Sequence, residues 1–161
     1  MSIPAVGDVA PDVALPDDNG TIHRLSDQRG RWTVLYFYPT DDTPGCTVEA
    51  CEFRDANETI HERGADVWGV SPQGAASKRA FREKFELRFT LLADVDHEVA
   101  DRYGTWVEKK NYGRVYWGNA RTTFIVDPEG RIARTWPKVK AEGHAADVLA
   151  ALDELQADTA R

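Results

Sequence analysis

The spacing of apolar and polar residues changes along the chain, and each spacing predicts either a strand or a helix. An unbroken apolar run at residues 34–38, stopped by Pro39, predicts a central strand covered on both faces. From Cys46 to about Arg63, apolar residues recur at helical spacing, and Gly64 supplies the stop signal. This second segment predicts a long amphipathic helix.

The alternation continues with a strand at residues 67–70, a helix at 75–87 and a short strand at 91–93. A further helix is expected near residues 95–103, with Asp94 as its N-cap and Gly104 as its end.

The pattern then becomes rich in β-favouring residues. Residues 122–126 and 131–136 are joined by an Asp-Pro-Glu-Gly turn, which predicts a hairpin. A last amphipathic helix is predicted at 145–156, and an N-terminal hairpin around Asn19-Gly20. This order of elements predicts an α/β fold of the thioredoxin-like kind, with a mixed central sheet and helices on both faces.

Composition narrows the class of protein. With 161 residues, 42% hydrophobic and 29% charged, residues 1–161 are expected to form one globular domain. The net charge of -7 argues against a nucleic-acid partner. Without a run of ~18 apolar residues or a basic leader, the chain is expected to be cytoplasmic, away from the membrane. No long unpaired strand is obvious, which favours a monomer.

Candidate chemistry gathers where the central strand passes into the long helix. Thr43 suits an N-cap and Pro44 the first helical position, so Cys46 falls in the first turn. A helix end favours a thiolate by only ~0.3–1 kcal/mol, whereas a guanidinium at ~4 Å contributes up to about 4 kcal/mol before desolvation. An arginine beside the sulfur would therefore have the larger effect on the thiolate.

The chain has two cysteines, five positions apart. On one helix their Cα atoms would be separated by about 7.5 Å along the axis and about 140° around it. Because a disulfide needs Cα atoms within roughly 7 Å, oxidation would have to unwind this stretch. We predict two states, namely thiols on an intact helix and a disulfide with the region remodelled.

Pro39, Thr43 and Cys46 match the Pro-x-x-x-Thr-x-x-Cys motif, and the chain thereby resembles the peroxiredoxins. The run Thr-Pro-Gly-Cys-Thr at 43–47, followed by Cys51, is similar to the bacterioferritin comigratory protein, or peroxiredoxin Q, subfamily. The resemblance extends over nearly the whole chain and includes residues 108–113 and 121–127.

This resemblance implies a role for each matching residue. Cys46 would be the peroxidatic cysteine and Cys51 the resolving one, while Thr43 would hydrogen-bond the peroxide and the thiolate. Arg121 would position both, and Pro39 would shield the sulfur from water. The family's usual reductant is thioredoxin, and no flavin, haem or metal is required.

The sequence leaves open the roles of several other residues and two alternative functions. Glu49 is interpreted as a first-turn acid, and the pair Asp41-Asp42 is expected to oppose thiolate formation. Four aromatic residues could line the pocket, contact the reductase or simply pack: Trp106, Tyr112, Tyr116 and Trp117. The alternatives to a peroxidase are a protein dithiol-disulfide oxidoreductase, although its usual Cys-x-x-Cys is absent, and a redox sensor using the same disulfide.

Overall fold

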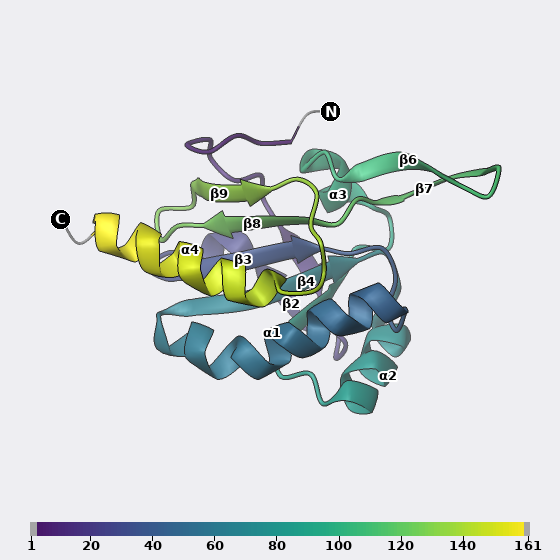
Figure 1. Ribbon diagram of the computed structural model, residues 1–161, viewed down its shortest axis with the longest axis horizontal. Helices are drawn as coiled ribbons and strands as arrows, with labels where there is room; N and C mark the ends of the chain where they lie inside the picture. Colours follow the sequence, from purple (N-terminus) through teal and green to yellow (C-terminus); the bar gives the residue numbers. More distant parts are fainter. Residues whose placement is uncertain (1–2, 160–161) are drawn as a thin grey trace.

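The computed structural model describes residues 3–159, and a mixed five-stranded sheet lies at its centre (Figure 1). The strands lie in the order β5–β4–β3–β8–β9, with bounds Thr90–Ala93, Ala65–Ser71, Trp32–Phe37, Thr122–Val126 and Ile132–Trp136. β3 pairs in parallel with β4 and antiparallel with β8. The predicted central strand and mixed sheet are confirmed.

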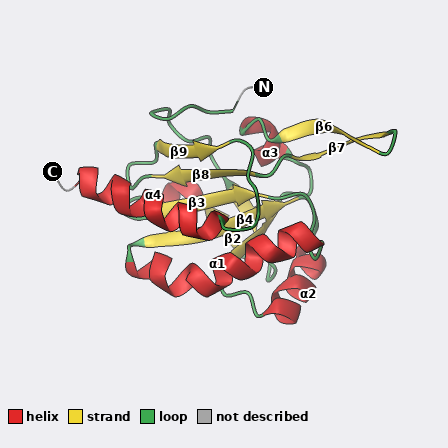
Figure 2. Ribbon diagram, viewed as in Figure 1, coloured by secondary structure: helices red, strands yellow, loops and turns green. Residues whose placement is uncertain are grey.

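Helices cover both faces of this sheet (Figure 2). α1 (Pro44–Glu62), α2 (Ala75–Phe85) and α4 (His144–Thr159) contribute to one core cluster, and α3 (Glu98–Arg102) to the other. The predicted α/β thioredoxin-like architecture is therefore confirmed.

The two faces of β3 explain this layering. All six of its residues are buried, which is the signature of a strand covered on both sides. Val34 and Tyr36 point into the cluster under α1 and α4, whereas Leu35 and Phe37 point into the cluster with α3. Each side chain alternates to the opposite layer, as the strand period requires.

Two hairpins lie outside the central sheet. β1 (Ala14–Pro16) and β2 (Ile22–Arg24) form the predicted N-terminal hairpin, followed by the short 3-10 helix η1 (Leu25–Gln28). β6 (Trp106–Asn111) and β7 (Arg114–Asn119) form a second hairpin, which projects from the body of the molecule (Figure 1). This second hairpin is not among the predicted elements.

The helix predicted near 95–103 is shorter than expected, and Asp94 is not its N-cap residue. α3 begins at Glu98, after His97 in a left-handed conformation with φ 49°. The Asp94 carboxylate still accepts hydrogen bonds from the N–H groups of Val99 at 3.2 Å and Ala100 at 2.9 Å. Asp94 therefore accepts hydrogen bonds from the first backbone N–H groups of α3, although it lies before the N-cap residue.

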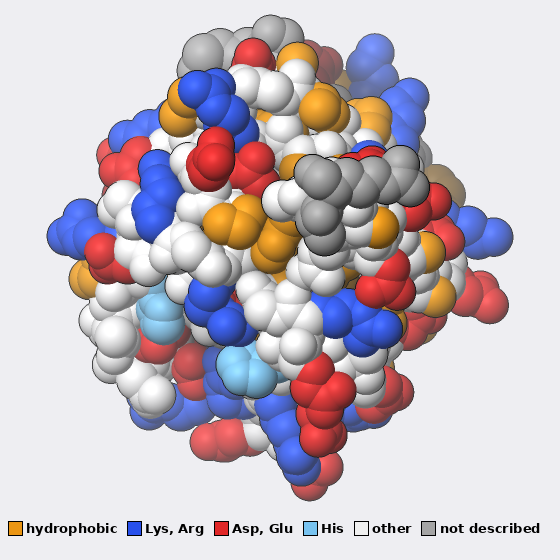
Figure 3. All heavy atoms as spheres, turned by 90° about the vertical axis from the view of Figure 1, so that its left-hand side faces the viewer, with side chains coloured by type: hydrophobic (Ala, Val, Ile, Leu, Met, Phe, Trp, Pro, Cys, Tyr) orange, Lys and Arg blue, Asp and Glu red, His pale blue; other side chains and the backbone are white. Residues whose placement is uncertain are grey.

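Acidic and basic side chains intermingle on the face at which β3 and β4 begin (Figure 3). Ion pairs there include Arg31 with Asp66 and Arg63 with Asp153. The Arg31–Asp66 side chains are 38% and 29% exposed, and Arg31 donates to both carboxylate oxygens of Asp66, so these charges form a partly solvated ion pair at this end of the sheet. Within residues 3–159, no helix is long and apolar enough to cross a bilayer.

Candidate active site

Cys46 lies where the chain leaves β3 and enters α1, at the end of the sheet opposite that in Figure 3. Thr43 occupies the N-cap position and Pro44 the first turn, as predicted. Cys46 is only 2% exposed and packs in the core cluster of Tyr36 and Phe53. The thiol is therefore desolvated at a helix N-terminus.

Arg121 reaches this thiol from the neighbouring strand. It immediately precedes β8, and the pairing of Phe37 with Thr122 brings it alongside the end of β3. Its Nη2 donates to the Cys46 Sγ at 3.4 Å. A guanidinium is therefore in contact with the sulfur and is placed to donate a charge-assisted hydrogen bond to it.

The interpretation of Glu49 as a first-turn acid is wrong. Glu49 lies in the second turn of α1, fully buried, and its Oε1 accepts a hydrogen bond from Arg121 Nη1 at 2.7 Å. Burial raises the pKa of this carboxyl to about 7, although Arg121 lowers it. Arg121 thus bridges a thiol and a buried carboxyl through two nitrogens of one guanidinium.

Cys51 lies on the same helix as Cys46 and is half-buried. Both cysteines are free, and α1 runs without interruption through both positions. This is the first of the two predicted states, with thiols on an intact helix. The disulfide state and its remodelling remain a prediction.

Thr43 and Pro39 belong to the loop that leads into α1. The Thr43 hydroxyl donates to the Thr40 carbonyl at 3.0 Å instead of capping the helix. Pro39 is half-buried, and its carbonyl accepts a hydrogen bond from Gln73 Nε2 at 3.2 Å. The predicted site residues therefore share one end of the sheet, close to where β8 begins.

The two acidic residues of this loop are paired with lysines from α2. Lys78 Nζ lies 3.4 Å from an Asp41 carboxylate oxygen, and Lys84 Nζ lies 2.9 Å from one of Asp42. The Lys78–Asp41 pair is buried, so Lys78 offsets the negative charge of Asp41 near the thiol. The Lys84–Asp42 pair is exposed, and water screens both of its charges from the thiol.

The β6–β7 hairpin contributes another cation, Lys109, which is half-buried. The pKa of its ammonium is lowered, first by burial and then by the positive charge of Arg121, while the negative charge of Cys46 opposes the shift. Of the aromatic residues on this hairpin, Tyr112 is fully exposed and Trp117 is 58% exposed. These two side chains do not pack into the core.

The fold and this site define the class of protein. Residues 6–135 match the profile of the AhpC/TSA family, and the chain belongs to that family. It is a thiol peroxidase with a thioredoxin-like fold.

Individual relatives place the chain more narrowly. Peroxiredoxin Bcp of Bacillus subtilis is 45% identical over 150 residues, covering 93% of this chain and 96% of the relative. Peroxiredoxin Bcp of Escherichia coli is 40% identical over 148 residues, covering 92% and 95%. The structure of the Xanthomonas campestris bacterioferritin comigratory protein superposes with a TM-score of 0.88 at 35% identity, covering 96% and 97%. The chain is accordingly similar to the Bcp, or peroxiredoxin Q, peroxiredoxins.

Proposed function

We propose that this thiol peroxidase reduces hydrogen peroxide and organic hydroperoxides at Cys46, with Cys51 as the resolving cysteine. The observation that carries the proposal is the contact of 3.4 Å between Arg121 Nη2 and Cys46 Sγ. It joins a nucleophile that must be anionic to a cation that favours the anion.

The first step is attack of the Cys46 thiolate on the peroxide. The sulfur bonds to one peroxide oxygen, the O–O bond breaks, and the other oxygen leaves as an alkoxide or hydroxide that is then protonated. Arg121 stabilises this developing anion, since a preorganised donor acts most strongly in a desolvated site. Thr43 would donate its hydroxyl to the peroxide, and Pro39 would keep water from the sulfur.

In the second step the Cys51 sulfur attacks the resulting sulfenic acid. An S–S bond forms, the S–O bond breaks, and the oxygen leaves as water. Because the two cysteines are separated on an intact helix, this step requires the first turns of α1 to unwind. Thioredoxin or a similar dithiol protein would then reduce the disulfide by exchange.

The proposal extends to the setting of the enzyme. The whole chain would act as one domain and as a monomer, without a flavin, haem or metal and without nucleic acid or membrane as partners. A cytoplasmic location suits the chemistry, because thiols recycled by a dithiol reductant need a reducing compartment. Organic hydroperoxides are included because the Xanthomonas campestris relative has been studied for alkyl peroxide reduction activity.

Steady-state turnover tests this proposal. The reduced protein is supplied with thioredoxin, its reductase and NADPH, and hydrogen peroxide or an alkyl hydroperoxide is added. We expect Cys46→Ser to lose all turnover, and Cys51→Ser to complete one turnover and stop. Sustained turnover by Cys46→Ser would refute the assignment. Reduction of a protein disulfide such as insulin, without peroxide consumption, would favour the dithiol-disulfide oxidoreductase instead.

A further inference from the structure

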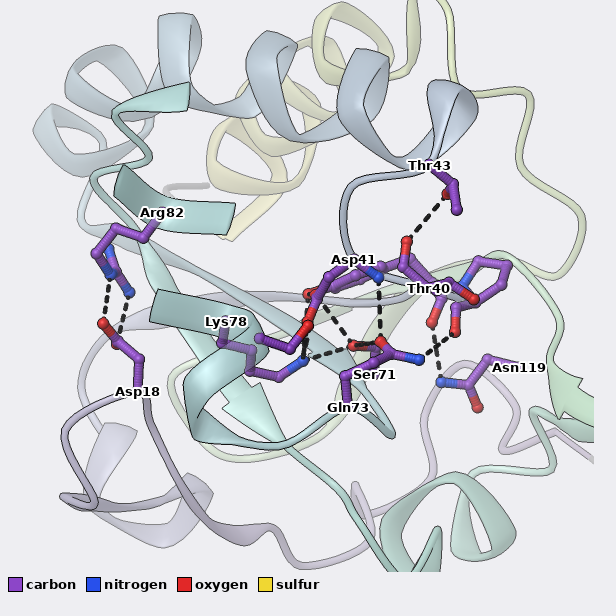
Figure 4. Close-up of polar contacts among 12 residues, drawn as sticks. Asp18, Thr40, Asp41, Thr43, Ser71, Gln73, Lys78, Arg82 and Asn119 are labelled. Atoms are coloured by element: carbon purple, nitrogen blue, oxygen red, sulfur yellow. Dashed lines mark hydrogen bonds and ion pairs between the residues drawn. The ribbon is translucent and has the colours of Figure 1, made fainter. Parts of the chain in front are cut away.

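A buried polar cluster lies behind the loop that leads to Cys46 (Figure 4). The side chains of Lys78 and Asp41 are 0% and 2% exposed, and their charged groups are 3.4 Å apart. Lys78 Nζ also donates to the Ser71 Oγ at 2.5 Å, and the hydroxyls of Tyr38 and Ser77 donate to Asp41. The cluster joins β4, α2 and the loop, and its two charged side chains are buried.

Neighbouring side chains also form hydrogen bonds with the backbone of this loop. Gln73 Nε2 donates to the Pro39 carbonyl at 3.2 Å, and Gln73 Oε1 accepts from the Asp41 amide at 3.1 Å. Asn119 Nδ2 donates to the Tyr38 carbonyl at 3.1 Å. Gln73, Asn119 and the Lys78–Asp41 pair therefore anchor the chain just before α1 begins (Figure 4).

The helix that follows is held less firmly at its start. Its N-cap residue, Thr43, makes no side-chain capping hydrogen bond, and Gly45 follows in the first turn. Both features weaken a helix terminus. This weakly capped turn is also the part that must unwind before Cys46 can reach Cys51.

A buried ion pair usually adds little to the stability of a loop. Removing two charges from water often exceeds their mutual attraction, and well-packed apolar residues of similar size are commonly as stable. Burial lowers the pKa of Lys78 to about 8 while Asp41 raises it, so the ammonium is largely charged at neutral pH. Because the hydrogen bonds of a charged ammonium have a preferred geometry, the pair holds the Asp41 carboxylate in one position.

We propose that the Lys78–Asp41 pair is a positioning device that sets the balance between the helix carrying the reactive thiol and the unwound form that makes the disulfide. Lys78 touches no reacting atom and acts through the loop. The inference rests on the proposed function of Cys46 and Cys51. It adds the element that decides how readily the second step follows the first.

Two reactions compete for the Cys46 sulfenic acid. Attack by Cys51 gives the disulfide and water, whereas a second peroxide oxidises the sulfur to sulfinic acid and is itself reduced to an alcohol or water. Anchoring the loop favours the folded helix, which speeds attack on the first peroxide and delays the disulfide. Releasing the loop should reverse both effects and protect the sulfur from overoxidation.

The test replaces Lys78 by methionine, which fills similar space without a charge. Rapid mixing with hydrogen peroxide would follow thiol oxidation and disulfide formation separately, and mass spectrometry would give the sulfinic fraction at high peroxide. We expect Lys78→Met to react with peroxide about tenfold more slowly and to form the disulfide about tenfold faster, a change matching the loss of one charged hydrogen bond. The sulfinic fraction should fall accordingly.

Lys84→Met is the matched control. Lys84 lies on the same helix and pairs with the next loop residue, Asp42, but these side chains are 59% and 43% exposed. Its rates should equal those of the wild type. Gln73→Ala provides a second variant, should Lys78→Met fold poorly, because it removes two backbone anchors and leaves the buried charges paired. It should shift both rates in the same direction as Lys78→Met.

Unchanged rates in both Lys78→Met and Gln73→Ala, with a wild type that forms the Cys46–Cys51 disulfide, would overturn the positioning role alone. An equal change in Lys84→Met would also overturn it, because burial would then be irrelevant. A wild type that loses no thiol to peroxide would overturn both this inference and the proposed function.

Discussion

At the scale of single residues, the site depends on how one guanidinium is shared. Arg121 donates through one nitrogen to Cys46 and through another to Glu49. The second Glu49 oxygen, Oε2, is buried without a hydrogen-bond partner. Glu49 therefore fixes Arg121 in place but is itself poorly solvated, which costs stability whenever the carboxyl is charged.

This cost predicts a pH-dependent stability. The pKa of Glu49 is raised by burial from 4.5 to about 7, so the folded protein binds this proton more tightly than the unfolded chain. The stabilising contribution is complete below the unfolded pKa and is lost as the pH rises towards 7. At pH 8, urea unfolding should therefore give Glu49→Gln a free energy of unfolding about 1–3 kcal/mol higher than that of the wild type.

Near pH 4.5 the difference between Glu49→Gln and the wild type should vanish. Glu58→Gln, at an exposed position on the same helix, should show no difference at either pH. An equal stabilisation of Glu49→Gln at both pH values would show that the carboxylate charge is not its cause.

At the scale of elements, the start of α1 is shaped by the approach of Arg121. A Cβ at Gly45 would lie 3.1 Å from Arg121 Nη2, which is closer than ordinary contact. Glycine at this helical position is a poor helix former, and alanine would be preferred by roughly 0.5–1 kcal/mol on backbone grounds. The sequence therefore gives up helix stability for contact between arginine and the helix.

Gly45→Ala should accordingly separate stability from activity. The helix should gain a few tenths of a kcal/mol or more, whereas the displaced guanidinium should lower the rate of Cys46 oxidation several-fold. Thermal unfolding and rapid peroxide mixing measure the two effects. Gly74→Ala, whose added Cβ would meet nothing within 4 Å, should leave the peroxide rate unchanged. A Gly45→Ala variant of undiminished rate would contradict the close approach.

The elements that could be predicted from the sequence are those with a strong apolar period. β3 and α1 bury regular faces, and their predicted bounds lie close to those of the structure. The β6–β7 hairpin could not be predicted in this way, because all of β6 and most of β7 is exposed or half-buried and no alternating apolar face results.

The site shows the same division. The motif of Pro39, Thr43 and Cys46 is local in sequence, and the resemblance extends it to Arg121. Glu49 and Lys78 could not be identified, since a charged residue on a helix normally indicates a solvated face. Their burial arises only when α1 and α2 pack beside the loop, which no local pattern reveals.

At the scale of the whole molecule, His144 connects α4 to the sheet. Its Nε2 lies 2.8 Å from the Thr123 hydroxyl, and the rings of Phe53 and Trp136 pack edge-on against it. Burial lowers the pKa of His144 from 6.5 to about 4, although Asp147 and Glu52 raise it. The imidazole is therefore neutral in the folded protein at neutral pH.

Between pH values of about 4 and 6.5, the folded and unfolded pKa values of His144, the unfolded chain binds more protons at this residue than the folded protein does. The His144 contribution to stability therefore rises with pH. Glu49 contributes the opposite slope over much of the same window. We expect His144→Gln to remove the His144 contribution, so that its stability falls more steeply than that of the wild type from pH 4.5 to 6.5. Urea unfolding across this range measures the slopes. Parallel curves for the two proteins would contradict a buried, neutral His144.

The central claim is that Cys46 attacks peroxide and Cys51 resolves the product, and a single-turnover experiment tests it most directly. The fully reduced protein is mixed without oxygen with one equivalent of hydrogen peroxide, while tryptophan fluorescence, free thiols and peptide masses are followed. The account predicts rapid loss of both thiols and a single disulfide between Cys46 and Cys51. Two thiols that persist for many minutes would contradict it.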